Sequence, residues 1–477
     1  MKRCIPLFML LLALMFSCAA AERTVYPDQG GVAVFVEDGK CGLINSDGEI
    51  ILDAEYDSIE PFDGKRFTVV HQDRWSGIIR SDGTVVHPCD AWFIDTIKEP
   101  DIVSIRYEDE RNCCIMDIGT GEILLEDAGN WCGLESGFYC IRRDEVSEIY
   151  DDEMNLLLTL PGSVSQIQDG WIIMYDGKAR CNNIYDMQGN LLYGSVNLTQ
   201  INNGRVFYVR SEEDGTTKRY YYGIIHPDGS RVEKTAEEYT CFFGTSYPYC
   251  LFNSKKAWFV DDQCEPVIPA EYDQAYGFCY GSAFVQKDGG WMLIDDQGQC
   301  IDNIVQNFSP LSAHPNISFW AVPSTPIVPI TIGEDVRLID RQGNFVNENT
   351  YSVGNMGYMD LFLDKWMILG DQDGIVAIIN GETGEACFDY PIEHYHLSFR
   401  RNGADETIWL CSGGLWGLMD LSAENAGHWI IEPQFADVKS DTIRGWRVNL
   451  TDDTGAYIDS NGIVTGPAPL ISRVLCL

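Results

Sequence analysis

A short pattern of apolar runs separated by glycine-containing turns recurs along most of this sequence. Its clearest copy occupies residues 40–59, KCGLINSDGEIILDAEYDSI, and follows an apolar run at residues 32–36. Runs of about five β-branched and apolar residues between turn residues predict short β-strands joined by hairpins. Gly48 lies in the second turn, where glycine adopts positive φ without steric cost. One such unit has too little apolar surface to fold alone, so the pattern predicts an array of stacked units.

Further copies follow at intervals of about 35 to 40 residues, which makes roughly twelve units, a spacing typical of solenoids and propellers. Readable copies lie at residues 75–88, 222–232, 257–273, 290–301, 415–420 and 429–435. Glycines that match Gly48 occur at Gly83, Gly121, Gly189, Gly229, Gly298, Gly343, Gly384 and Gly462. Weaker copies without the glycine lie near Asn155, Glu265 and Ala426. Because no long stretch has the helical period, the sequence predicts an all-β fold of tandem antiparallel units.

We expect the array to be β-propeller-like, because radial repetition leaves only short, protected strand edges. An open, superhelical β-solenoid is the alternative. The apolar segment at residues 470–477 is expected to pair with the strand at residues 32–36 and close a ring. Residues 211–219 are expected to form a long exposed hairpin loop. A proline-rich insertion near residues 308–334 is expected to be a loop or a junction, because prolines at that density do not fit a central strand.

The combination of a Trp-Gly-apolar strand, an Asp-Gly turn and a closing Tyr-Asp step resembles the WG-repeat family of bacterial proteins, also called KWG repeats. The resemblance is clearest at residues 40–59, 257–273 and 415–435, and in degenerate form it covers nearly the whole chain. Trp416 and Gly417 form a literal Trp-Gly pair. The resemblance implies an all-β repeat protein of an exported or envelope-associated kind. It implies no catalytic residues, because the signature positions are structural.

The N-terminal residues carry the pattern of an export signal. Two basic residues precede an apolar stretch at residues 5–16, and three alanines precede Glu22. This predicts a signal peptide over residues 1–21 and a repeat array over residues 22–477. The alternative is a lipoprotein signal in which Cys18 carries the lipid. No later stretch is apolar enough to span a bilayer, so we expect a secreted or extracytoplasmic protein.

Acidic side chains outnumber basic ones by 72 to 33, which gives a net charge of −39. This balance argues against nucleic acid as a partner, since nucleic-acid binding depends on basic residues that meet phosphates. It argues equally against docking on anionic lipid. A strongly acidic surface keeps an exported protein soluble, and attraction of Ca²⁺ or of a cationic partner is the narrower alternative.

Few groups are arranged for chemistry. Residues 371–374 (DQDG) and the pair Asp261-Asp262 partly match calcium loops, but the twelve-residue pattern with its terminal glutamate is absent. His394 and His396 form a His-x-His pair without a third ligand nearby. We therefore predict no metal, no cofactor and no catalytic residue, with Ca²⁺ kept as the alternative.

The 17 cysteines include Cys4 and Cys18 in the signal region, so an odd number remains after cleavage. Several stand at apolar repeat positions, and we expect them to be small buried hydrophobes: Cys41, Cys140, Cys250, Cys279 and Cys411. Disulfides between others are left open. Most aromatic residues recur at repeat positions and are expected in the core. A minority, Trp131, Trp320 and Trp366, are expected on loops as candidates for stacking on a sugar or a peptide.

The function that this pattern predicts is a non-catalytic scaffold whose loops bind a protein or a glycan at the cell surface or in the envelope. The alternative from another class is a carbohydrate-active or other hydrolase that uses loop carboxylates on a propeller. A purely structural envelope component is a third possibility. The identity of the binding residues is not predicted.

Overall fold

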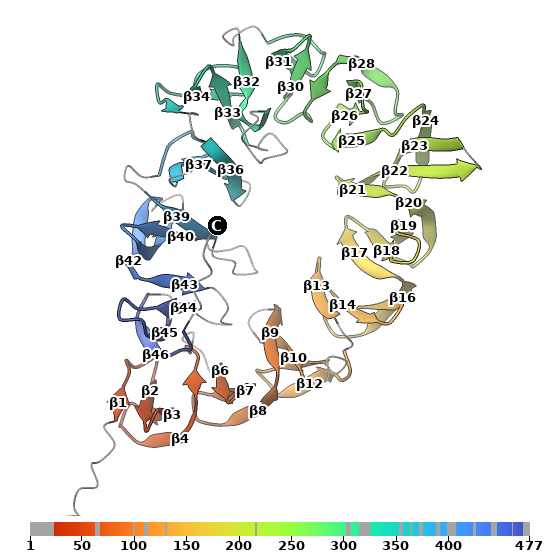
Figure 1. Ribbon diagram of the computed structural model, residues 1–477. Helices are drawn as coiled ribbons and strands as arrows, with labels where there is room; N and C mark the ends of the chain where they lie inside the picture. The colour runs from red at the N-terminus through yellow and green to blue at the C-terminus, as the bar shows by residue number, and fades with distance from the viewer. Residues whose placement is uncertain are drawn as a thin grey trace, which may run out of the picture. The chain divides into compact units, whose positions relative to one another are not determined.

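The computed structural model describes residues 23–62, 67–98, 101–108, 113–128, 131–214, 217–301, 307–313, 325–352, 356–362, 365–371, 375–387, 392–397, 407–422, 426–439, 446–459 and 461–470. The described chain forms twelve small sheets, in each of which the strands are hydrogen-bonded to their neighbours in chain order (Figure 1). Among the described residues the only helical segment is the short 3-10 helix η1 (Leu311–Ala313). The predicted all-β fold of short antiparallel units is confirmed, and each sheet has the meander of a propeller blade.

The chain divides into two compact units, residues 1–126 with 430–477 and residues 127–429. The sheets of the first unit are formed by β1 (Thr24–Val25), β2 (Val32–Glu37), β3 (Lys40–Asn45) and β4 (Ile50–Tyr56); β5 (Ser58–Ile59), β6 (Phe67–Gln72), β7 (Trp75–Arg80) and β8 (Val85–Ala91); β9 (Phe93–Lys98), β10 (Ile102–Arg106), β11 (Cys113–Asp117) and β12 (Glu122–Leu125); and β43 (Asp437–Lys439), β44 (Trp446–Asn449), β45 (Gly455–Ile458) and β46 (Val464–Pro467).

The sheets of the second unit are formed by β13 (Trp131–Glu135), β14 (Phe138–Arg143), β15 (Val146–Tyr150) and β16 (Leu156–Pro161); β17 (Ser163–Gln168), β18 (Trp171–Asp176), β19 (Cys181–Asp186) and β20 (Leu191–Val196); β21 (Leu198–Asn202), β22 (Arg205–Asp214), β23 (Thr217–Ile225) and β24 (Arg231–Ala236); and β25 (Cys241–Gly244), β26 (Tyr249–Phe252), β27 (Ala257–Val260) and β28 (Pro266–Tyr272). They continue with β29 (Gln274–Ala275), β30 (Ser282–Lys287) and β31 (Gly290–Asp295); β32 (Phe308–Pro310), β33 (Ile327–Ile332), β34 (Asp335–Asp340) and β35 (Tyr351–Ser352); β36 (Met356–Phe362), β37 (Trp366–Asp371) and β38 (Ile375–Asn380); and β39 (His394–Leu397), β40 (Thr407–Ser412) and β41 (Leu415–Asp420). The last strand of that sheet, β42 (His428–Phe435), begins in this unit and ends in the first one.

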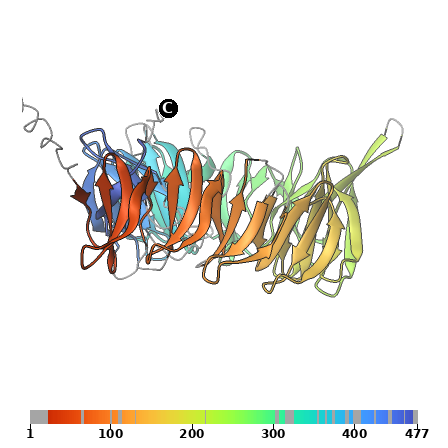
Figure 2. The same ribbon diagram turned by 90° about the horizontal axis from the view of Figure 1, so that it is seen from below.

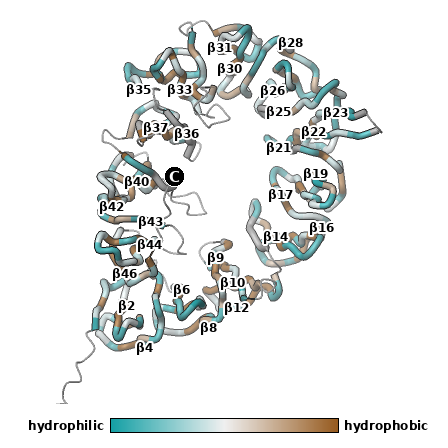
Figure 3. Tube along the Cα trace, in the orientation of Figure 1, coloured by the Kyte–Doolittle hydropathy of each residue, from teal (hydrophilic) through white to brown (hydrophobic). Residues whose placement is uncertain are grey.

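The repeat at residues 40–59 spans the boundary between two sheets. Strands β3 and β4 complete one sheet, and β5 begins the next after the single residue Asp57. Hydrophobic side chains from both sheets meet in one cluster, in which Val34 and Leu43 lie with Ile59. Hydrophobic stretches recur in this way from sheet to sheet in Figure 3. The core of each unit is therefore a series of layers between neighbouring sheets, which is why one repeat cannot fold alone.

The predicted turn glycines all adopt the left-handed conformation. Gly48 and the eight glycines that match it have φ between 75° and 83°. At two of the copies that lack the glycine, Met154 and Cys264 take the same conformation with φ of 63° and 54°. The turn geometry is therefore kept even where the side chain makes it costly.

The hairpin at residues 211–219 is not a loop, which corrects the prediction. β22 and β23 stay paired from Val206 and Ile225 out to Asp214 and Thr217. The two strands project beyond their neighbours as the yellow-green hairpin of Figure 2. The guanidinium carbon of Arg210 lies 3.8 Å from the centroid of the Tyr221 ring, and this stacking supports the strands beyond the end of the sheet.

The proline-rich segment is also partly strand. Pro310 lies in β32 and Pro329 in β33, which runs between β32 and β34. The expectation of a loop or junction near residues 308–334 is therefore wrong at residues 308–310 and 327–332. The last residue pair between β32 and β33 is Pro310 with Ile330, so β33 at Pro329 is paired with β34 alone. Residues 314–324, which hold Trp320, lie outside the described residues.

The C-terminal part of the first unit approaches the first strands by packing and not by the predicted pairing. Both edges of β2 are occupied, by β1 and β3. Instead β46 packs against β2 and β5. A Cβ atom on Gly466 would lie 3.4 Å from the carbonyl oxygen of Ile59 and 3.6 Å from a methyl group of Val34, so the strands meet closely there. Residues 471–477 lie outside the described part of the chain.

The signal peptide predicted for residues 1–21, with its alternative at Cys18, also lies outside the described residues. Among the residues that are described there is no helix with the length and hydrophobicity needed to cross a membrane.

Candidate binding site

The signature residues of the repeat hold neighbouring sheets together. Lys40 Nζ lies 2.6 Å from Asp57 Oδ1, and the other oxygen of Asp57 accepts a hydrogen bond from the backbone N–H of Asp73 in the next hairpin. The same ion pair recurs between Lys256 and Asp273 at 2.8 Å. We call this Lys–Asp pair the latch. Its groups are engaged in structure, as the family resemblance implies.

Many acidic side chains serve as turn caps. Asp186 Oδ1 accepts hydrogen bonds from the backbone N–H groups of Gln188 and Asn190, at 2.9 and 2.8 Å. Hydrogen bonds, first of all from the Asn190 side chain, hold the pKa of Asp186 below its usual value. The same two-bond cap is made by Asp151, Asp261, Asp295, Asp340 and Asp459. Part of the acidity of the chain is therefore a requirement of its turns.

The predicted metal candidates are placed apart or engaged elsewhere. Asp261 caps its turn, and Asp262 forms an ion pair with Arg205. His394 is exposed on β39, the first strand of its sheet, and the register pairs His396 of the same strand with Trp409. Residues 372–374 lie outside the described part of the chain. Within the described residues no group of three His, Cys, Asp or Glu side chains is placed to hold a metal ion.

The expected burial of cysteines at repeat positions is confirmed for Cys41, Cys140, Cys250 and Cys411. Cys279 is only half-buried, which corrects the expectation at that position. Burial raises the pKa of the Cys41 thiol to about 11 and that of Cys140 to about 12, so both stay protonated.

Trp366 corrects another expectation. It is 1% exposed in β37 and not on a loop, so it cannot stack on a ligand. Trp131 is the first residue of β13, so the expectation that it lies on a loop is also wrong.

A serine, a histidine and a glutamate meet on the sheet β5–β8, a grouping that sequence reasoning missed. His71 Nδ1 lies 3.1 Å from Ser76 Oγ, and His71 Nε2 lies 3.1 Å from Glu60 Oε1. A catalytic serine must be open to its substrate. Ser76 is only 8% exposed and stands at the repeat position of Cys41. We therefore assign this group to cross-strand packing.

A second buried polar cluster surrounds Glu233 on β24. Arg210 donates two hydrogen bonds to its carboxylate, at 2.9 and 2.8 Å, and the hydroxyls of Tyr193 and Tyr208 donate further ones. Burial alone raises the pKa of Glu233, but these hydrogen bonds outweigh it and lower the pKa to about 2. The cluster is fully paired and fixes the base of the projecting hairpin.

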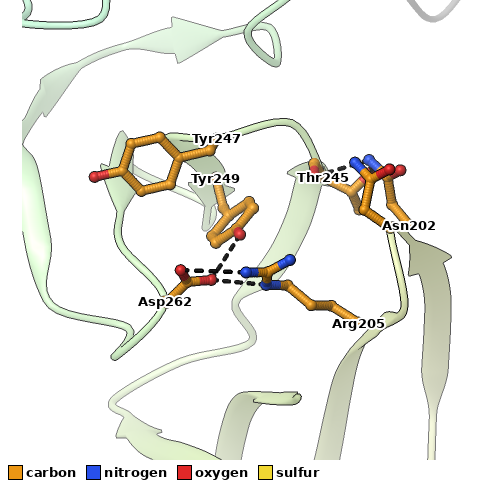
Figure 4. A pocket seen from close by; sticks show the side chains of 7 residues that line it. Asn202, Arg205, Thr245, Tyr247, Tyr249 and Asp262 are labelled. Atoms are coloured by element: carbon orange, nitrogen blue, oxygen red, sulfur yellow. Dashed lines mark hydrogen bonds and ion pairs between the residues drawn. The ribbon is translucent and has the colours of Figure 1, made fainter. Parts of the chain in front are cut away.

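An open hollow in the second unit remains as the candidate site. Its lining residues come from neighbouring sheets (Figure 4): Asn202, Asn203, Arg205, Thr245, Tyr247, Tyr249 and Asp262. The first three surround the turn between β21 and β22, the next three lie at the connection of β25 to β26, and Asp262 lies in the turn after β27. The hollow holds about 210 Å³. This is below the roughly 300–1,000 Å³ of pockets for drug-sized ligands, so it fits one ring or one side chain.

The floor of the hollow is an ion pair. Arg205 Nε donates to Asp262 Oδ1 at 2.8 Å, Nη2 donates to Oδ2 at 3.4 Å, and the Tyr249 hydroxyl donates to Oδ1 at 2.7 Å. Burial raises the pKa of Asp262, but the hydrogen bonds from Tyr249 and Arg205 outweigh it, so the pKa is lowered overall. Asp262 is thus ionised at neutral pH and its charge is balanced by Arg205.

One wall of the hollow is aromatic and another is formed by amides. The Tyr247 side chain is 57% exposed and meets the buried ring of Tyr249 edge to face, with centroids 5.7 Å apart. Asn202 Nδ2 donates to the carbonyl oxygen and the hydroxyl of Thr245, at 2.9 and 3.1 Å. The side chain of Asn203 is exposed, and no hydrogen bond to it is found within the described residues.

The turn that carries Asn203 is anchored by the preceding sheet. Gly204 donates its backbone N–H to Asp169 Oδ2 at 3.0 Å, and its carbonyl oxygen accepts a hydrogen bond from Trp171 Nε1 at 2.9 Å. Asn203 itself is held in the left-handed conformation with φ of 49°. The amide is therefore presented to the hollow from a fixed backbone.

Sequence reasoning did not find this site. Arg205 and Asp262 are 57 positions apart, and no local pattern joins them. One available signal is that the turn at Asp261 carries a second acidic residue where the first repeat has Ser46.

The sheets, each a short antiparallel meander that passes directly into the next, define a repeat scaffold of propeller-like blades. The family described as "WG containing repeat" matches residues 42–75 and 259–291. The chain therefore carries WG repeats, and the resemblance predicted from the sequence is confirmed at these two places.

Similarities to solved structures are distant. A crystal structure of a eukaryotic initiation factor aligns with a TM-score of 0.29 and 9% identity, covering 85% of this chain and 96% of that one. A structure of Kluyveromyces lactis Hsv2p aligns with a TM-score of 0.25 and 11% identity, covering 64% of this chain and 94% of that one. No curated protein matches the sequence.

Proposed function

We propose that this chain is a non-catalytic repeat scaffold, exported across the cytoplasmic membrane, that binds a protein or a glycan at the cell surface or in the envelope. The observation that carries the proposal is the hollow between β21–β22 and β25–β28. It offers the exposed aromatic ring of Tyr247 and the free side-chain amide of Asn203 on a backbone that neighbouring sheets hold in place. Its only carboxylate is held by an arginine and a tyrosine.

The arrangement supports binding more than hydrolysis. Glycoside hydrolysis needs two carboxyl groups that face one another across a bond, one of them ready to give up a proton. In the hollow Asp262 is the single acidic lining residue, its pKa is lowered, and its oxygens accept hydrogen bonds from Arg205 and Tyr249. Such a group can position a partner but is poorly suited to act as a general acid.

Binding is tested with the purified protein on an array of glycans and by capture of surface proteins with identified prey. We expect retention of one partner class and no change in that partner after long incubation. Cleavage of the bound glycan or protein would overturn the non-catalytic part of the proposal. Failure to retain any glycan or protein would overturn the whole.

Export is tested by cell fractionation of the native chain. The proposal expects the protein outside the cytoplasmic membrane, with residues 1–21 removed. Retention at the membrane that is abolished by Cys18→Ser would identify the lipid-anchored alternative. An uncleaved protein in the cytoplasm would contradict the export proposal.

A further inference from the structure

We infer that the hollow takes one neutral sugar ring, a hexose unit of a glycan, in preference to an acidic sugar or a charged peptide side chain. This inference rests on the proposed function, because it names the partner class of the same site. It is carried by the size of the hollow, by the charge balance of its lining and by the groups that stay free in it.

The size and openness fit a single ring with the rest of the chain outside. A volume of about 210 Å³ is too small for several linked sugars or for a folded peptide segment. Tyr247 lines the hollow and is itself exposed to solvent, so the rest of the glycan can continue into solvent on the side of that tyrosine. A terminal or branching sugar meets this requirement.

The charge balance disfavours ions of either sign. Arg205 is the single cation among the lining residues, and two of its nitrogen atoms already bind Asp262. An acidic sugar would meet no unpaired cation and would approach a chain of net charge −39. A cationic side chain would have to compete with Arg205 for Asp262. A neutral ligand pays neither cost.

The free groups match the chemistry of vicinal hydroxyls, each of which both donates and accepts hydrogen bonds. The Asn203 amide offers two donors and one acceptor, and the exposed Tyr247 hydroxyl offers one of each. The C–H face of a pyranose packs on an aromatic ring, and Tyr247 is held for this by its edge-to-face contact with Tyr249. The hydrogen bonds of Arg205 and Tyr249 on Asp262 keep the floor rigid before the ligand arrives.

The test is a binding comparison of the full protein with three matched probe sets: neutral oligosaccharides, oligosaccharides that contain uronic or sialic acid, and charged peptides. Four proteins are compared: native, Tyr247→Ala, Asn203→Ala and the control Tyr280→Ala. Tyr280 is 60% exposed in the same unit and does not line the hollow. Equal melting temperatures of the four proteins show that none of the substitutions acts by unfolding.

We expect neutral glycans to bind, and Tyr247→Ala to weaken that binding by about tenfold or more, because the stacking surface is lost. Asn203→Ala is expected to weaken it by a few fold, and Tyr280→Ala to leave it unchanged. Acidic glycans or peptides that bind better than neutral glycans and depend on Tyr247 would overturn the inference and leave the proposed function standing. Neutral-glycan binding that survives Tyr247→Ala would also overturn it. Absence of any bound glycan or protein overturns both.

Discussion

The repeat that begins at Lys40 and the repeat that begins at Lys256 have the same frame and different uses. Both contain the latch, with N–O distances of 2.6 and 2.8 Å. In both, the tyrosine before the latch aspartate pairs with the residue after the latch lysine, Tyr56 with Cys41 and Tyr272 with Ala257. The first copy is used for packing throughout. The second copy also contributes to the hollow.

The difference arises at one turn position. In the first copy Ser46 donates a hydrogen bond to Asp28 of its own sheet at 3.2 Å. In the second copy the equivalent residue is Asp262, which reaches Arg205 and Tyr249. The latch and the turn conformation hold the backbone in both copies. The comparison teaches that the turn tips of this array are free to acquire a site while the frame stays unchanged.

A second difference concerns the cross-strand pair at the signature glycine. Gly42 lies opposite Phe35, whereas Trp258 at the equivalent position lies opposite Leu251. A Cβ atom on Gly42 would lie 2.7 Å from the Phe35 ring and 2.5 Å from the carbonyl oxygen of Leu52. The aromatic residue of the pair is Phe35 on β2 in the first copy and Trp258 on β27 in the second, so the summed side-chain volume of the pair is roughly kept.

The largest expected effect therefore comes from Gly42→Ala. The added methyl group forces β4 or the Phe35 ring to move, which should lower the free energy of unfolding by roughly 3 kcal/mol. Chemical denaturation measures this, with the exposed turn variant Ser46→Ala as the control near zero. A loss as small as that of the control would show that the first copy does not need its glycine and would remove this difference between the copies.

A smaller effect is expected at the turn glycine. A Cβ atom on Gly48 meets nothing within 4 Å, so Gly48→Ala adds only the cost of φ at 79°, about 1 kcal/mol.

Cys264 takes the equivalent position at φ of 54° and is buried. Cys264→Gly relieves the backbone but empties a packed site, so we expect no gain in stability. A clear gain, seen as a higher denaturation midpoint, would mean that the buried sulfur contributes little.

Loss of a latch carboxylate should appear in the pH dependence of stability. The hydrogen bond from Lys40 is the first cause that lowers the pKa of Asp57 when folded, and that from Lys256 lowers the pKa of Asp273. A carboxylate whose pKa is lower in the folded than in the unfolded protein stabilises the folded protein at pH values above its unfolded pKa, near 3.9. This contribution is lost as the pH falls from there through the folded-state pKa. Melting temperatures of Asp57→Asn and Asp273→Asn should therefore fall less steeply in acid than that of the native protein. Parallel curves for all three would contradict a role for either carboxylate.

The smallest effect is expected from the lysines of the latch. Both pairs are partly exposed, so Lys40→Met and Lys256→Met should each cost little stability and cost less at high salt. Asp57 keeps its hydrogen bond from Asp73 in the lysine variant, which is why this effect is smaller than that of Asp57→Asn. Thermal melts at low and high ionic strength measure it. A large and unequal loss would show that the two latches are not equivalent.

The frame of this protein is readable from its sequence because its determinants are local. The left-handed turn at Gly48 depends on four neighbouring residues, and the alternating apolar runs specify strands within a few positions. The hollow is not readable, because Asn202, Tyr247 and Asp262 come from separate turns that only the stacking of sheets brings together. The burial of Trp366 is not readable either, because a degenerate repeat hides the period that marks a core position.

The approach of β46 to β2 and β5 has a consequence for the order in which the chain matures. The first unit is built from both ends of the chain, residues 1–126 and 430–477, while the second is continuous. During synthesis or translocation the second unit has all its residues before the first unit does. Domains usually fold from the N-terminus onward. Here the first unit gains its last sheet only when residues 430–477 have been made, and until then the face of β2 that meets Gly466 lacks its covering strand.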